Sequence, residues 1–327
     1  MRRLRVSLCL VFLALAAWLF WLLALPAPTF TRPARVTVAP GESAREVGAR
    51  LARHGIVHSQ TAFRLAVRLF CDWRRVKAGT YRLPPYSSAA SIADLLASGH
   101  LERVRIVIPE GWTVELIAAR LAAQGMGDGS PLGLADVPDY PPGLPQPPDG
   151  RLEGYLFPDT YFVEMAPEGR SALVGMMLDR LDQVVWRGLL GGREPAGLTF
   201  HQLLTLASLV EGEAKLDRER PLIAGVLTNR LRRGQRLECD ATILYALGLR
   251  AQRVTHSDLA VDSPYNTYRY AGLPPGPINN PGLASIRAAL HPAAVPYYYY
   301  VARADGSHVF SRTYQEHLAA VRRSRGQ

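Results

Sequence analysis

The sequence predicts an α+β protein with an N-terminal transmembrane helix, a small α/β module and a larger mixed α+β domain. Three observations lead to this prediction. An uncharged apolar run lies near the N-terminus, a strand-turn-helix pattern occurs twice in the following ninety residues, and helical and extended patterns alternate in the rest. The chain has 327 residues, 48% hydrophobic and 20% charged, which is typical of globular proteins and excludes a disordered or collagenous chain.

The apolar run covers residues 6–25 and contains no charged side chain. At about 1.5 Å per residue, such a helix reaches about 30 Å, the thickness of the hydrocarbon core of a bilayer. Three arginines stand within residues 1–5 and the next basic residue is Arg32, so the positive-inside rule predicts a cytoplasmic tail over 1–5. A cleaved signal peptide is the alternative, but its apolar region usually has only about 7 to 15 residues. We therefore expect a single-pass anchor in the cell (inner) membrane and a periplasmic or otherwise extracytoplasmic body.

A linker over 26–35 leads into the predicted module, 36–126, which contains an internal repeat. Residues 38–56 and 107–126 have the same pattern, and an offset of 70, which sets Ser43 on Thr113, gives five identities among the thirteen positions 44–56. Each copy has the pattern of a short strand, a Pro/Gly turn, a Ser or Thr cap and an amphipathic helix that ends at a glycine. This unit resembles the LysM fold, a small glycan-binding module. A spacer domain without a ligand is the alternative.

Residues 127–150 contain seven prolines and five glycines, which disfavour helix and sheet. We predict a linker or a long surface loop there, followed by the larger domain over 151–327. This domain begins with an aromatic-rich turn that carries Glu153 and Asp159. Aromatic rings beside polar groups suit sugar rings, whereas a Pro-Asp turn that caps a strand is the alternative.

A capping box from Thr199 to Gln202 opens the next helix. At 100° per residue, Glu211 shares one stripe with the apolar side chains of Phe200, Leu204, Ala207 and Ala214. Such surroundings favour the neutral carboxyl, so we expect the pKa of Glu211 to rise toward the range of a general acid. Glu213 points about 200° away, so only one of the two glutamates can face a given cleft. A salt-bridged or half-buried structural glutamate is the alternative for either.

Further polar candidates lie downstream. One predicted helix carries Asn229, and another opens at Asp240. Rigid Pro/Gly loops follow, and their amide side chains and rings could form a saccharide cradle, although such loops are also common without function. The loop candidates are Tyr265, Asn266, Tyr268 and Asn280.

The sequence lacks the signature motifs of several classes of enzyme and binding protein. The chain has no G-x-S-x-G, H-E-x-x-H, Walker A or dinucleotide-binding motif. Its basic residues are scattered despite a net charge of +10, so we expect no nucleic-acid partner. Its three cysteines form no C-x-x-C and no cluster with histidine, which excludes a zinc-ribbon framework. Because the sequence displays no metal or cofactor signature, we expect neither. We expect Cys71 and Cys239 to be buried free thiols rather than a disulfide.

Taken together, collinear segments of this chain resemble the endolytic murein transglycosylases, the MltG (YceG-like) family. In that family the first glutamate of a V-E-x-E-A segment is the catalytic acid/base, which corresponds to Glu211. Gly212 and Cys239 stand where members of the family often have Lys and Ser. The matching segments are 153–161, 207–214, 229–231, 240–247, 265–268, 272–276 and 291–292.

The resemblance implies a catalytic domain over 151–327 that cleaves the MurNAc-β-1,4-GlcNAc bond within peptidoglycan strands. Cleavage would leave 1,6-anhydro-MurNAc ends and terminate the elongation of nascent strands, with peptidoglycan synthases as candidate partners. Glu211 would protonate the leaving oxygen and then take the proton of the attacking C6 hydroxyl. The alternatives are a non-catalytic cell-wall binding protein, or a glycoside hydrolase that pairs Glu211 with Glu153, Asp240 or Glu213.

Overall fold

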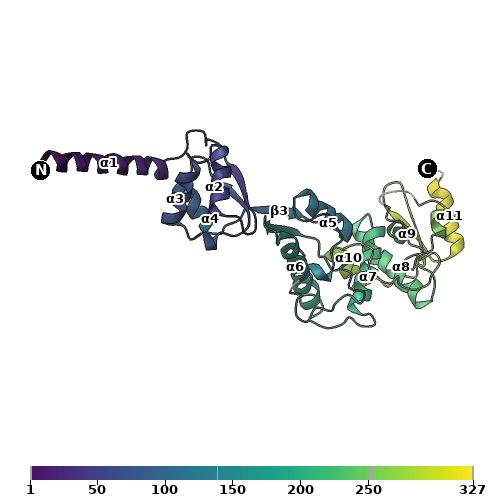
Figure 1. Ribbon diagram of the computed structural model, residues 1–327. Coiled ribbons are helices and arrows are strands. Elements are labelled where there is room, and N and C mark those ends of the chain that lie inside the picture. The colour runs from purple at the N-terminus through teal and green to yellow at the C-terminus, as the bar shows by residue number, and fades with distance from the viewer. Residues whose placement is uncertain (1, 138, 250–253, 326–327) are drawn as a thin grey trace. The chain divides into compact units, whose positions relative to one another are not determined.

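The structure is a computed structural model that describes residues 2–137, 139–249 and 254–325. Over these residues it contains eleven α-helices and three two-stranded sheets, which confirms the α+β class (Figure 1). The chain divides into two compact units. The first consists of Met1–Arg105 and Phe162–Gly169, and the second of Ile106–Tyr161 and Arg170–Gln327.

The first unit packs helices beside a short antiparallel sheet. Val36 of β1 lies opposite Tyr81 of β2, and both side chains are buried in a core shared with Leu51 and Phe63. Ser43 begins α2 with the capping box that its sequence predicts, because the Ser43 backbone N–H donates a hydrogen bond to the Glu46 carboxylate. The elements are α1 (Arg2–Ala24), β1 (Ala34–Val38), α2 (Ala44–Arg53), α3 (Gln60–Phe70), β2 (Gly79–Leu83) and α4 (Ala89–Ala97).

Helix α1 contains most of the predicted membrane-spanning run. Several of its apolar side chains are exposed, among them Leu10, Phe12, Trp18 and Phe20. Within the described residues, however, no helix combines the length and the apolar character that crossing a bilayer requires. The transmembrane assignment of residues 6–25 therefore stays a prediction.

The two copies of the repeat form the predicted strands and helices. Strand β3 (Arg103–Val107) and α5 (Val114–Ala123) repeat the pattern of β1 and α2, with Thr113 as the cap. The division into compact units falls between Arg105 and Ile106, so most of the second copy belongs to the second unit. The predicted module over 36–126 is thus divided, and its likeness to LysM stays a prediction.

The Pro/Gly-rich segment is a surface loop of the second unit. Arg170 hydrogen-bonds Asp136 and the backbone oxygens of Ser130 and Pro131. Leu132 and Leu144 are buried. These contacts hold the described part of the loop against the second unit.

In the second unit, α7 is the central helix. Helices α8, α9 and α10 pack on α7, and every side chain from Leu203 to Val210 is buried. The remaining elements are β4 (Thr160–Glu164), which pairs with β3, α6 (Gly169–Leu181), α7 (Phe200–Glu213), α8 (Arg220–Arg232), α9 (Asp240–Ala246), α10 (Leu283–Leu290), the hairpin of β5 (Tyr299–Ala302) and β6 (His308–Ser311), and α11 (Tyr314–Arg325).

Candidate active site

Glu211 lies in the last turn of α7, at the end of its buried stretch. Thr199 and Gln202 form the predicted capping box, which fixes where the helix starts and therefore which way Glu211 points. Gly212 lets α9 approach closely, because a Cβ atom there would lie 2.7 Å from the Cβ of Ala241. The start of α7 and the close approach of α9 therefore set the position of Glu211.

The carboxylate of Glu211 has two polar partners. The backbone N–H of Gly282 donates to its Oε2 at 3.0 Å, and the Arg220 guanidinium forms an ion pair with the same oxygen at 3.1 Å. The Glu211 and Arg220 side chains are only 8% and 10% exposed. The helical stripe predicts only apolar neighbours for Glu211. In the structure Glu211 also contacts a cation, Arg220 of α8, which the stripe cannot reveal.

Further contacts hold Arg220 in place. Its Nε donates to Asp217 at 3.1 Å, and its Nη1 donates to the Ser285 hydroxyl. Asp217 is exposed, whereas Ser285 is fully buried at the start of α10. The guanidinium therefore joins Glu211 to the segment that begins α10.

Two predicted substrate-binding residues connect buried segments. Asn280 is fully buried, donates to Glu153 at 3.1 Å and accepts from the backbone of Leu156 at 2.8 Å. Glu153 is 5% exposed and also accepts from the backbone of Val114. Burial, with a smaller contribution from the charge of Glu115, raises the pKa of Glu153 to about 8. The polar groups of Glu153 and Asn280 are thus used within the protein.

The raised pKa of Glu153 predicts a pH-dependent stability. Below pH 4.5 the carboxyl is protonated in both the folded and the unfolded chain, whereas between 4.5 and about 8 only the folded chain keeps the proton. The free energy of unfolding should therefore fall as pH rises through this range, by at most about 1.4 kcal/mol per pH unit. Glu153→Gln should flatten this fall in denaturation curves.

The control for this experiment is Asp94→Asn, which removes an exposed carboxyl from α4. It should keep the wild-type slope. An equally steep slope in Glu153→Gln would show that other groups cause the pH dependence.

Glu213 occupies a different cluster from Glu211, as the 200° separation predicts. One of its carboxyl oxygens is buried without a hydrogen-bond partner. Burial first, and then the charge of Asp240, raises the pKa of Glu213 to about 7. Burial likewise raises the pKa values of the neighbouring Cys239 thiol and Tyr300 hydroxyl.

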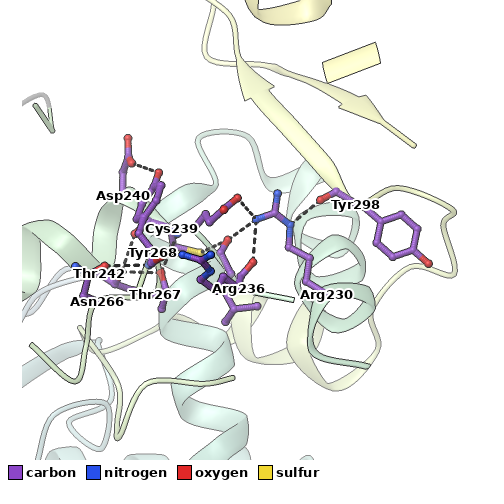
Figure 2. A network of polar contacts seen from close by, with 11 residues as sticks. Arg230, Arg236, Cys239, Asp240, Thr242, Asn266, Thr267, Tyr268 and Tyr298 are labelled. Carbon is purple, nitrogen blue, oxygen red and sulfur yellow. Dashed lines mark hydrogen bonds and ion pairs between the residues drawn. The ribbon is translucent and has the colours of Figure 1, made fainter. Parts of the chain in front are cut away.

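Figure 2 shows the polar network at the start of α9. The Tyr268 hydroxyl donates to Asp240 at 2.6 Å. Asn266 is fully buried, donates to two backbone oxygens of the preceding loop and accepts from the backbone N–H of Tyr268. Nearby, Arg230 donates to the backbone oxygens of Leu237 and Tyr298. The bond from Tyr268 to Asp240 therefore joins the loop that carries Asn266 to the start of α9.

The other candidates also have partners within the protein. Asn229 donates to the backbone of Val295 and Tyr297. The Tyr265 ring packs on Tyr245 with a centroid distance of 4.9 Å. Asp159 pairs with Arg180 at 2.9 Å, directly before β4, which matches the alternative of a turn at the start of a strand.

Cys71 and Cys239 are free thiols, as expected. Cys239 is buried, but Cys71 is only half-buried because it lies at the end of α3. Among the described residues, no three His, Cys, Asp or Glu side chains lie close enough to hold a metal ion.

No sequence pattern singles out Arg220 or Glu110 as a neighbour of Glu211. Arg220 stands where α8 begins, and the sequence marks that position as a helix start rather than as a partner of Glu211. Glu110 lies in the Pro-Glu-Gly turn of the second repeat copy, and its carboxyl packs against Gly282, the residue that donates to Glu211. The repeat pointed to the turn but gave no reason to join it to a helix so distant in sequence.

Comparison with known proteins agrees with the arrangement of these segments. The sequence model of the YceG-like family matches residues 36–323. The chain is 32% identical over 301 residues to the endolytic murein transglycosylase of Bacillus subtilis (strain 168), covering 87% of this chain and 83% of that protein. It is also 32% identical over 313 residues to the endolytic murein transglycosylase of Streptococcus pneumoniae serotype 2 (strain D39 / NCTC 7466), covering 86% of this chain and 56% of that protein.

A solved structure agrees as well. The crystal structure of a YceG-like protein from Listeria monocytogenes has a TM-score of 0.57 and 31% sequence identity to this chain, and the match covers 89% of this chain and 99% of that one. This chain belongs to the YceG-like family.

Proposed function

We propose that this chain is a peptidoglycan lytic transglycosylase that cleaves within glycan strands and uses Glu211 as its acid/base. The observation that carries the proposal is the position of Glu211, held at the end of a buried helix beside a cation and a backbone N–H. The similarity of the chain to proteins named endolytic murein transglycosylase supports peptidoglycan as the substrate class.

The surroundings of Glu211 suit the transfer of a proton. As the carboxyl protonates the leaving oxygen of GlcNAc, it becomes a carboxylate. Arg220 and the Gly282 N–H stabilise the charge that develops, and they need not move to do so. The carboxylate then takes the proton of the MurNAc C6 hydroxyl while O6 bonds to C1. The bond from C1 to the leaving oxygen breaks, no water is consumed and Glu211 regains its proton.

Mass spectrometry of digested sacculi tests this function. A lytic transglycosylase gives soluble fragments with 1,6-anhydro-MurNAc ends, a hydrolase gives reducing ends, and a binding protein gives no new ends. Fragments of many lengths would support cleavage within strands, whereas release of disaccharides from strand ends alone would contradict it.

We also propose that α1 anchors the chain in a membrane, as residues 6–25 predict, and that its partners are the synthases that make nascent strands. The exposure of Leu10, Phe12 and Phe20 supports this proposal, because exposed apolar side chains are costly in water. The arginines within residues 1–5 support a cytoplasmic N-terminus.

A topology experiment checks the anchor. A reporter that works only outside the cytoplasm, fused after Gln327, should be active, and the mature protein should keep its N-terminus. The control is a fusion without residues 1–25, which should stay inactive in the cytoplasm. Cleavage near Ala27 would identify a signal peptide instead.

A further inference from the structure

The carboxyl group of Glu110 lies directly against Gly282, at the start of α10. A Cβ atom added to Gly282 would clash with the Glu110 carboxyl carbon, and its three nearest atoms would all belong to that carboxyl group. Gly282 has φ −75°, which any residue can adopt, so its backbone conformation does not require glycine. The space that a side chain would need at this position is filled by Glu110.

Glu211 adjoins the same glycine. The Gly282 N–H donates to Glu211, and a Cβ atom added to Gly111 would lie 3.5 Å from the Cγ of Glu211. The turn that carries Glu110 therefore packs on the Glu211 side chain, and both carboxyl groups border one residue.

Backbone hydrogen bonds fix this turn in place. The Gly111 N–H donates to the carbonyl of Asn280, and the Asn280 N–H donates to the carbonyl of Trp112, both at 2.9 Å. Asn280 is fully buried, and its side chain also donates to Trp112. The approach of Glu110 to Glu211 is therefore built into the second unit and does not depend on the Glu110 side chain.

The charges around the two carboxyl groups oppose one another. Arg220 places a cationic charge beside the Glu211 carboxyl, and Asp217 offsets only part of that charge from an exposed position. Burial, followed by the charge of Glu211, raises the pKa of Glu110, while Arg220 opposes this shift. Two carboxyl groups that interact in this way titrate as a pair, because a charge on one makes it harder for the other to lose its proton.

We propose that Glu110 is a positioning residue of the active site, which acts through Glu211 by keeping a proton on the carboxyl pair. This proposal rests on the proposed function. The proton held by the pair is then available to Glu211 at the start of each turnover despite the adjacent guanidinium. The proton passes from Glu211 to the leaving oxygen, the C6 hydroxyl returns one to Glu211, and Glu110 itself forms and breaks no bond with the substrate.

The test is the pH profile of cleavage by the full chain, measured with purified uncrosslinked glycan strands. Glu110→Gln removes the charge and keeps the shape, so the alkaline limb of kcat should move about one pH unit toward acid, with about a tenfold loss of kcat above it. KM and the melting temperature should stay unchanged, because the side chain makes none of the backbone bonds of the turn. Glu110→Asp keeps the charge and should shift the limb less.

Two further variants make the test specific. Glu115→Gln removes an exposed carboxyl from the first turn of α5 and should keep the wild-type profile. Gly282→Ala should displace the Glu110 carboxyl and shift the limb in the same direction as Glu110→Gln. The double variant should shift the limb no further than either single one, because both changes remove the same interaction.

The outcomes separate this inference from the proposed function. A wild-type profile in Glu110→Gln, together with an inactive Glu211→Gln, would overturn the inference and leave the proposed function intact. A raised KM with an unmoved limb would also overturn it, since Glu110 would then bind saccharide. Full activity in Glu211→Gln would instead refute the proposed acid/base.

Discussion

Replacing Glu211 by glutamine is expected to lower the rate of glycan cleavage by about 10²- to 10⁴-fold, the usual contribution of a positioned acid/base. Glutamine keeps the size of the side chain and can still accept the hydrogen bond of the Gly282 N–H, but it can neither give nor take the proton that the reaction moves. The loss should appear in kcat, because binding of the strand does not need the proton. Release of soluble fragments from sacculi measures it.

The variant should also fold. Arg220 loses its ion pair with Glu211 but keeps Asp217 and Ser285 as partners, so the guanidinium is not left unpaired. Circular dichroism and a melting curve check this point.

The matched control is Glu213→Gln, two residues along the same helix. Glu213 is half-buried in the cluster with Cys239 and Tyr300, and its pKa of about 7 means that glutamine resembles its protonated form. This variant should change cleavage far less than Glu211→Gln. Full activity in Glu211→Gln together with a loss in Glu213→Gln would assign the acid/base role to Glu213.

Local sequence signals were enough to predict the helix that carries Glu211. A capping box predicts where α7 begins, and a rotation of 100° per residue then places Glu211 and Glu213 on different sides of the helix. The α+β class and the strand-helix pairs of the repeat follow from equally local patterns.

The partners of Glu211 could not be predicted in this way. Arg220, Gly282 and Glu110 come from three separate segments, and only the packing of α7, α8 and α10 brings them together. The periodicity of one segment does not predict which other segments it will contact.

The roles of polar residues in rigid loops could not be predicted from the sequence, for a different reason. Asn280 and Glu153 have the side chains that a saccharide site needs, yet they bond each other across 127 residues of sequence. Asn266 likewise uses its amide to hold its own loop. The same residue types satisfy buried backbone groups and bind sugar hydroxyls, so composition alone does not separate the two roles.

The second large effect is expected in the isotope content of the product, which identifies the nucleophile. If the C6 hydroxyl of MurNAc attacks C1, digestion in ¹⁸O-labelled water should give MurNAc ends that carry no label and are lighter by one water than the hydrolytic product. A hydrolytic muramidase, run in parallel on the same sacculi, should introduce the label at every new end. Mass spectrometry of the two digests compares them directly.

The proposed mechanism predicts the unlabelled product. A hydrolase needs a second carboxylate as nucleophile or as base for water. Glu153, which the sequence offers for this role, bonds Asn280 and the backbone of Val114, and Asp240 accepts from Tyr268 in another cluster. Glu110 is the carboxyl that borders the same glycine as Glu211, and we assign it the retention of a proton rather than the activation of water. Incorporation of ¹⁸O at C1 by the wild-type chain would reverse that assignment, and loss of the label in Glu110→Gln would then identify Glu110 as the base.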